Sequence, residues 1–210
     1  MTSASRGRLF LVRHGESRGN RLRQFSRDND IDLTDRGVEQ AQAAGRALGA
    51  RISPGRIVAS PYFRTRRTAA LIAEMLGFQD EIELVHDLHE RNIGELAGKP
   101  YESMRQHPEF DPERFWEWRP GGGESLADVM SRVAPVIEKL LEDPRDTVVV
   151  THGGVMLAVR AYIEGRWSES RVARNAEVLV VGADERDRLF LQPFDPRDGA
   201  TEGSDGEETG

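Results

Sequence analysis

Short apolar runs that alternate with longer amphipathic segments constrain the fold of this chain more than any other feature. Six runs have the length and composition of strands, at 8–12, 57–59, 82–85, 147–150, 178–181 and 189–192. The segments 35–50, 64–76, 125–142 and the stretch that ends near Ile163 carry apolar residues at helical spacing. Strands that alternate with helices predict an α/β fold with a mostly parallel central sheet and helices on both of its faces.

One long segment breaks this alternation. Residues 87–123 contain four prolines, a run of three glycines and two tryptophans, without a clear apolar period. We interpret this segment as a lid-like insertion with some helix. The expected organisation is a single catalytic domain over residues 1–194. It is followed by a tail, 195–210, whose six acids, four glycines and scarcity of apolar residues are typical of disorder.

Composition excludes several classes of protein. The 210 residues include no cysteine, which rules out disulfides and cysteine-dependent phosphatases. The net charge of −7 lies mainly in the tail, so the near-neutral body predicts no nucleic-acid partner. No apolar stretch is long enough to span a membrane, and residues 1–8 lack the apolar run of a signal peptide. We therefore expect a cytoplasmic protein with no membrane association.

Two of the predicted strands end in the same dipeptide. Val12-Arg13 leads into His14-Gly15, and Val150-Thr151 leads into His152-Gly153. Parallel α/β sheets bind ligands beyond the carboxyl ends of their strands. If the two strands are neighbours, both histidines reach the same edge of the sheet, and the loop after 57–59 brings Arg64 there.

This set of residues suits phosphoryl transfer. A neutral imidazole such as that of His14 is a good nucleophile toward phosphorus. Arg13 and Arg64 could bind the phosphoryl oxygens and offset their charge, together with a cationic His152. Glu90, just past the third strand, is the best-placed acid to protonate the leaving oxygen and then to deprotonate a water molecule.

Several ordered motifs resemble the histidine phosphatase superfamily, the phosphoglycerate mutase-like proteins. The resemblance begins at Leu11-Val12-Arg13-His14-Gly15-Glu16-Ser17 and continues at Leu33-Thr34-Asp35-Arg36-Gly37 and Ser60-Pro61-Tyr62-Phe63-Arg64. It extends through Glu90–Gly94, Gly123-Glu124-Ser125 and Thr151-His152-Gly153, covering roughly residues 8–181 in the order of the family.

The resemblance implies a three-layer α/β/α sandwich and a phosphohistidine intermediate on His14. It implies that Glu90 is the proton donor and that a substrate site is formed by Arg13, Asn20, Arg64, Arg91, His152 and Gly153. The segment from Glu90 to Glu124 is shorter than in the mutases, and Gly154 stands where they tend to have asparagine. Both departures favour a phosphatase, although Glu90-Arg91 and Pro135 are mutase-like.

The expected function is therefore a metal-independent phosphatase that hydrolyses small phosphate monoesters without a cofactor. A phosphoglycerate mutase-type transfer remains an alternative. Asp30-Ile31-Asp32-Leu33-Thr34 also resembles the nucleophile motif of magnesium-dependent haloacid dehalogenase-like phosphatases, but it follows no apolar strand. A non-catalytic module that binds a phosphorylated partner is a further alternative. The substrate is not specified by sequence, and the oligomeric state stays open, with a homodimer among the options.

Overall fold

A computed structural model describes residues 6–26, 29–167 and 172–195, and it contains one six-stranded sheet. The strand order is β3-β2-β4-β1-β5-β6. The strands are β1 (Leu9–Arg13), β2 (Arg56–Ala59), β3 (Glu83–Leu84), β4 (Thr147–Thr151), β5 (Val178–Ala183) and β6 (Leu189–Pro193). The first four are mutually parallel, whereas β5 and β6 are antiparallel additions.

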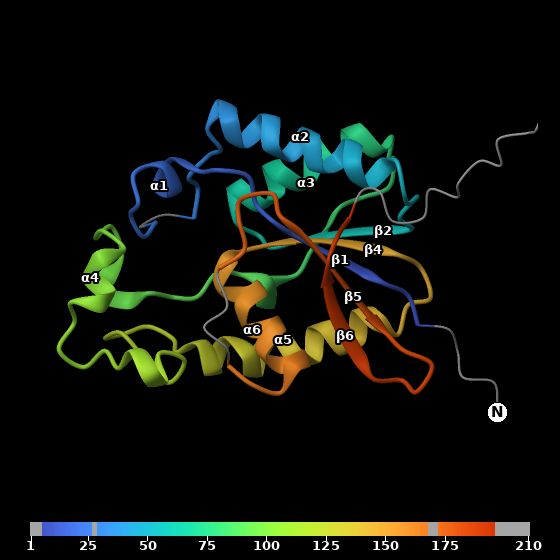
Figure 1. Cartoon of the computed structure of the whole chain (residues 1–210). Helices are drawn as coiled ribbons and strands as arrows, with labels where there is room; N and C mark the ends of the chain where they lie inside the picture. The colour runs from blue at the N-terminus through green and yellow to red at the C-terminus, as the bar shows by residue number, and fades with distance from the viewer. Residues whose placement is uncertain (1–5, 27–28, 168–171, 196–210) are drawn as a thin grey trace, which may run out of the picture.

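Helices cover both faces of this sheet, which confirms the predicted α/β architecture. Helices α2 (Asp35–Gly49) and α3 (Phe63–Leu76) lie on one face, and α5 (Leu126–Leu141) and α6 (Gly153–Glu164) lie on the other (Figure 1). Each face has its own apolar core. Phe10 and Ile57 belong to the core under α2 and α3, whereas Leu11 and Val149 belong to the core under α5 and α6.

Local sequence explains where these elements begin and how closely they pack. All five residues of β4 are buried, as expected for a valine-rich strand in the middle of a parallel sheet. Ser125 and Asp128 form the predicted capping box at the start of α5, and Thr34 caps α2. A Cβ atom at Gly45 would lie 2.7 Å from the Cβ of Met75, so a glycine is required where α2 approaches α3.

The predicted third strand is shorter than expected. We predicted residues 82–85, but β3 has only two residues, and both are exposed. It pairs with β2 alone, at the edge of the sheet, so it lacks the burial that the inner strands obtain from two neighbours.

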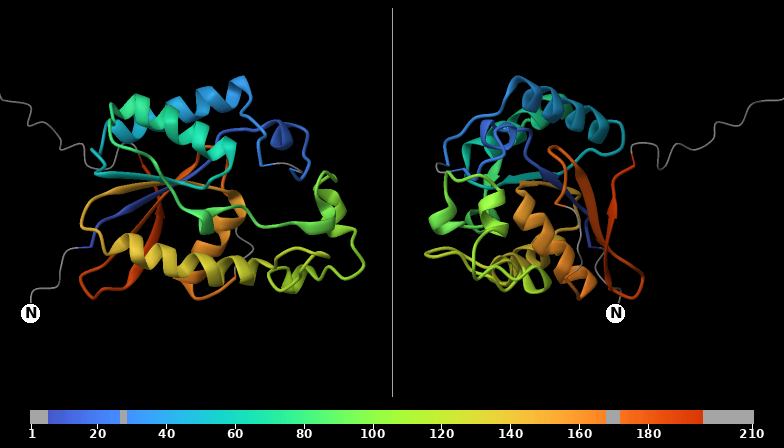
Figure 2. Two further views of the ribbon diagram at one scale, coloured as in Figure 1. Left: turned by 180° about the vertical axis from the view of Figure 1, so that it is seen from behind. Right: turned by 60° about the vertical axis from the view of Figure 1, so that its left-hand side comes forward.

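The segment 87–123 is irregular, as predicted. Its regular structure is limited to short helical turns: η1 (His86–Leu88), which spans its start, and η2 (Gly94–Leu96), α4 (Glu102–Arg105) and η3 (Pro112–Arg114) within it. Figure 2 shows that this segment extends from one end of the sheet, where the short helix α1 (Arg18–Arg21) also lies. No pattern in the sequence predicted α1. The proposed tail, apart from Asp195, lies outside the described residues. No described helix has both the length and the hydropathy of a membrane span.

Candidate active site

Three neighbouring parallel strands bring polar side chains to one edge of the sheet. His14 directly follows β1, His152 follows β4, and Ser60 follows β2. Arg13 pairs in register with Thr151, and the His14 amide donates to the Thr151 carbonyl at 2.9 Å. The side chains of His14, His152 and Ser60 are fully or almost fully buried. The predicted convergence of the two His-Gly segments is therefore present.

Arg64 joins the two histidines. It lies in the first turn of α3, and its side chain is buried. Its Nε donates to His14 Nε2 at 3.2 Å, and its Nη2 lies 3.2 Å from His152 Nδ1. One guanidinium therefore orients both imidazole rings, whose centroids are 5.3 Å apart.

The hydrogen bonds of His14 define its tautomer. Its Nδ1 lies 2.7 Å from the carbonyl oxygen of Gly15, which can only accept, so Nδ1 carries the proton. Nε2 therefore bears the lone pair that Arg64 engages. Burial, followed by the charges of Arg64 and Arg13, lowers the pKa of His14 well below its ordinary value of 6.5. His14 is thus a neutral imidazole with its nucleophilic nitrogen at the site.

His152 is also neutral, and here the expectation of a cationic ring was wrong. Burial, then the charges of Arg64 and neighbouring groups, lowers its pKa well below 6.5. Because Arg64 donates to Nδ1, the proton lies on Nε2, which donates to Ser60 Oγ at 2.8 Å. Arg64 thus sets the tautomer of His152, and Ser60 accepts the remaining ring proton, a role that no sequence pattern assigned although Ser60 lies in a recognised motif.

Two buried arginine nitrogens at this site have no hydrogen-bond partner. They are Nε of Arg13 and Nη1 of Arg64. Arg13 is otherwise anchored through Nη1, which donates to the carbonyl of Ala173 at 2.6 Å. Unpartnered buried donors are costly, and an anion is the ligand that would satisfy them. The predicted pairing of Arg13 and Arg64 around an anion therefore has a geometric basis.

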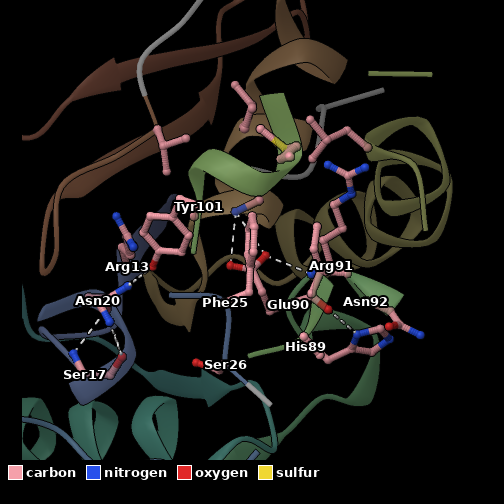
Figure 3. A pocket seen from close by; sticks show the side chains of 18 of the residues that line it. Arg13, Ser17, Asn20, Phe25, Ser26, His89, Glu90, Arg91, Asn92 and Tyr101 are labelled. Carbon is pink, nitrogen blue, oxygen red and sulfur yellow. Dashed lines mark hydrogen bonds between the residues drawn. The ribbon is translucent and has the colours of Figure 1, made fainter. Parts of the chain in front are cut away.

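Asn20 connects the site to two distant segments. Its Oδ1 accepts from the backbone and hydroxyl of Ser17 and from Asn175 Nδ2, while its own Nδ2 donates to the Tyr101 hydroxyl at 3.0 Å (Figure 3). The same Asn175 nitrogen also donates to the His14 carbonyl at 3.0 Å. Asn20 lines the cavity, but most of its hydrogen bonds stabilise the wall. Tyr101 and Asn175 were missed because no local pattern marks them.

Glu90 and Arg91 both line the cavity, yet their side chains have different surroundings. Glu90 Oε1 accepts from the backbone N–H groups of Arg91 at 2.8 Å and of Gly154 at 3.1 Å. Arg91 donates instead to the backbone carbonyls of Glu124 and Trp118, both at 2.7 Å. Burial lowers the pKa of Arg91 to about 10. The guanidinium of Arg91 thus supports the wall of the cavity. The predicted contact between Arg91 and the substrate therefore has less structural support than the predicted roles of the other site residues.

The glycines that open α6 leave room for this arrangement. Gly153, predicted in the substrate site, is buried, and a Cβ atom there would lie 2.6 Å from Val172 Cγ1 and 3.4 Å from Arg13 Nε. A Cβ atom at Gly154 would lie 2.4 Å from Glu90 Oε1. The Glu90 carboxylate thus occupies the space that a side chain at position 154 would fill.

The cavity around these groups has a volume of about 1340 Å³, which exceeds the roughly 300–1,000 Å³ typical of small-molecule sites. Its inner end is formed by His14, Arg13 and Arg64, whereas His152 lies buried behind the lining. Its outer part is lined by aromatic and aliphatic side chains, among them Phe25, Tyr101, Met104, Phe110 and Phe115. Figure 3 shows Asn20 and Tyr101 on one side of this view and Glu90 and Arg91 on the other.

The alternative motif Asp30-Ile31-Asp32 lies elsewhere. Both aspartates are exposed in the loop before α2, and Asp32 accepts from the Leu33 amide at 2.6 Å. Neither residue follows a strand or lines the cavity. Within the described residues, no group of three or more His, Cys, Asp or Glu side chains is arranged to hold a metal ion.

The fold and site together define an α/β protein with two histidines and two arginines at the carboxyl edge of a parallel sheet. The model of the histidine phosphatase superfamily (branch 1) matches residues 9–193. The chain therefore belongs to the histidine phosphatase superfamily, whose enzymes are phosphatases or mutases.

The relatives include both activities. A 2,3-bisphosphoglycerate-dependent phosphoglycerate mutase of Methylobacterium sp. is 34% identical, over 77% of this chain and 83% of that protein. A metal-independent phosphoserine phosphatase of Arabidopsis thaliana is 33% identical, over 82% of this chain and 75% of that protein. The structure of a mycobacterial glucosyl-3-phosphoglycerate phosphatase with VO3 superposes with a TM-score of 0.77 at 28% identity, covering 90% and 98% of the two chains.

Proposed function

We propose that this protein is a metal-independent phosphatase that hydrolyses phosphate monoesters through a phosphohistidine on His14. The observation that carries the proposal is a neutral His14 beside two buried arginine donors that lack partners. A phosphoryl group fits this arrangement because its oxygens would accept from Arg13 and Arg64 while its phosphorus faced His14 Nε2. The arginine charges offset the charge of the transferring group, which a metal ion would do in other phosphatases.

The reaction would proceed in two displacements. In the first, Arg64 Nε gives up its hydrogen bond to His14 Nε2, the freed lone pair attacks phosphorus to form the N–P bond, and the ester P–O bond breaks. Glu90, in its acid form, gives a proton to the departing alkoxide. In the second, Glu90 takes a proton from water as the water oxygen attacks phosphorus, and the N–P bond breaks to release inorganic phosphate. Hydrogen bonds from the arginines would hold the phosphoryl oxygens through both steps, while His152 keeps the Arg64 guanidinium in place.

Two features favour hydrolysis over a mutase cycle. A mutase must bind a second anionic group of a bisphosphate, but of Arg23, Arg91 and Arg105, which line the outer cavity, the first two are already engaged. Arg23 forms an ion pair with Glu102, with 2.7 Å between Nη2 and Oε1, and Arg91 is bound to two backbone carbonyls. The aromatic and aliphatic lining instead favours an ester whose alcohol part is larger than glycerate and partly apolar.

Mutase activity is the second candidate function because a Methylobacterium relative is a phosphoglycerate mutase by name. If the protein were not catalytic, the site would bind phosphorylated ligands without turnover. Glu90 and His14 line one cavity, which favours an enzyme.

The test is phosphate release from a panel of monoesters in excess EDTA. The panel would include phosphoserine, 3-phosphoglycerate, a sugar phosphate and 2-phenylethyl phosphate. The proposal predicts release that survives the chelator in the wild type and is lost in His14→Asn. Transfer between phosphoglycerates that requires a bisphosphate, without net release, would instead support a mutase. Release only after added magnesium would contradict the histidine mechanism, and binding without release would support the non-catalytic module.

A further inference from the structure

We infer that Arg132 is the positioning residue for the general acid, because it fastens the loop that carries Glu90 to helix α5. This inference rests on the proposed function. Arg132 lies beyond the cavity lining, on the second turn of α5, and its side chain is only 15% exposed.

The guanidinium of Arg132 binds several acceptors of the loop that carries Glu90. Nη1 donates to the Asp87 carbonyl at 2.5 Å, and Nη2 donates to the His89 carbonyl at 3.0 Å. Nη2 also lies 3.5 Å from the Glu90 carbonyl. These contacts span the residues immediately before and at the proposed acid, so one side chain holds the backbone there.

Glu124 completes the fastening from the other side. Its Oε1 accepts from Arg132 Nε at 2.8 Å, and its Oε2 accepts from the Asn92 amide at 2.8 Å. Its backbone carbonyl accepts from Arg91 Nε at 2.7 Å. The pair of Arg132 and Glu124 therefore binds the chain on both sides of Glu90. Partial burial of both partners strengthens such charge-assisted contacts compared with exposed pairs.

The position of the Glu90 carboxylate depends on this backbone. Its side-chain partners are backbone N–H groups, those of Arg91 and Gly154. The loop itself has little regular structure, with the three-residue turn η1 before it and no strand through it. If the Arg132 contacts were lost, the loop would be free to shift relative to α6. A displacement of about 1 Å at a reacting group can reduce a rate by about a hundredfold.

A pair of esters that differ in their leaving group tests this role. An alkoxide needs a proton as it departs, so 2-phenylethyl phosphate depends on the general acid, whereas p-nitrophenolate leaves as a stable anion. We expect Arg132→Met to lower kcat/KM for 2-phenylethyl phosphate by roughly ten- to a hundredfold. We expect a change of less than about threefold for p-nitrophenyl phosphate. Glu90→Gln should show the same selectivity more strongly, and Arg132→Lys should fall between Arg132→Met and the wild type.

The matched control is Arg160→Met, which removes another partly buried arginine and its ion pair with Glu164, on α6. It should leave both esters unchanged. Equal losses of both esters in Arg132→Met would overturn the inference, because a merely structural role would lower both. Unchanged hydrolysis of both in Arg132→Met and Arg132→Lys would also overturn it. Failure of the proposed function is distinct, since the wild type would then hydrolyse neither ester or Glu90→Gln would show no selectivity.

Discussion

We expect the substitution Gly154→Ala to lower activity without lowering stability. Gly154 is the second residue of α6, and its backbone N–H donates to Glu90. A Cβ atom there would lie 2.4 Å from Glu90 Oε1, whereas ordinary contacts begin near 3.4 Å. The carboxylate must therefore move by roughly 1 Å, which can reduce catalysis by about a hundredfold.

The same change should not harm the fold. Glycine within a helix is less favourable than alanine by up to about 1 kcal/mol, and Glu90 ends in a flexible side chain that can move aside. We expect the free energy of unfolding of Gly154→Ala to equal or exceed that of the wild type. The assay is kcat/KM for 2-phenylethyl and p-nitrophenyl phosphate, together with urea unfolding.

The expected result is a loss of about a hundredfold with the alkyl ester and of less than about threefold with the aryl ester. Gly49→Ala is the control, because it changes a helical glycine at the end of α2, where the added Cβ would lie 3.3 Å from Leu76 Cδ2. Full activity of Gly154→Ala toward the alkyl ester would refute the reasoning, since the position of Glu90 would then be immaterial.

Three further predictions concern the inner end of the cavity. Ser60→Ala removes the acceptor of the His152 Nε2 proton. It should lower kcat/KM about tenfold and stability by about 1 kcal/mol, measured by steady-state kinetics and urea unfolding. Arg64→Met should lower kcat/KM by about a thousandfold, and an NMR titration should show the pKa of His14 rising toward 6.5, because one of the charges that lowers it is removed. Stability should fall as pH drops below 6.5, since the unfolded chain then protonates both histidines while the folded protein keeps them neutral. The loss should reach about 1.4 kcal/mol per pH unit for each buried imidazole, and urea unfolding from pH 7 to 5 checks it, with a constant stability contradicting the assignment.

The pairing of His14 with His152 could be predicted from sequence because two independent signals coincide. Each histidine follows a short apolar strand, and the carboxyl ends of parallel strands share one edge. Arg64 was predictable for a similar reason, since it lies in the first turn of the helix that follows β2. The position of a residue that directly follows a strand is fixed by the sheet, so it can be predicted once the strand is recognised.

Partners that act across long sequence separations could not be predicted. Asn175 reaches the carbonyl of His14, and Arg132 reaches the loop of Glu90, from segments whose relative placement is defined only by tertiary packing. The charge state of His152 was also mistaken, because the burial and the Arg64 contact that lower its pKa are properties of the folded site. Arg132 had a weak signal, since it is a charged residue between Val129 and Val133, which are buried.

The loop from 87 to 123 resisted prediction for a different reason. Its backbone is held by local turns and by side chains such as Glu95, which accepts from the Gly121 backbone N–H. Because these contacts need no regular spacing of apolar residues, the sequence has no pattern that predicts the course of the chain here. Tyr101, Phe110 and Phe115 of this segment line the outer cavity, so under the proposed function the segment would set the substrate preference.

The most direct test of the central claim is to trap the phosphorylated enzyme. The protein would be mixed with a radiolabelled phosphate monoester in excess EDTA, quenched within milliseconds in alkali, and digested for peptide mapping. We predict one labelled peptide that contains His14, with a bond that is stable in alkali and labile in acid, and no label in His14→Asn. Phosphate release without an alkali-stable label on the enzyme, or release that persists in His14→Asn, would contradict it.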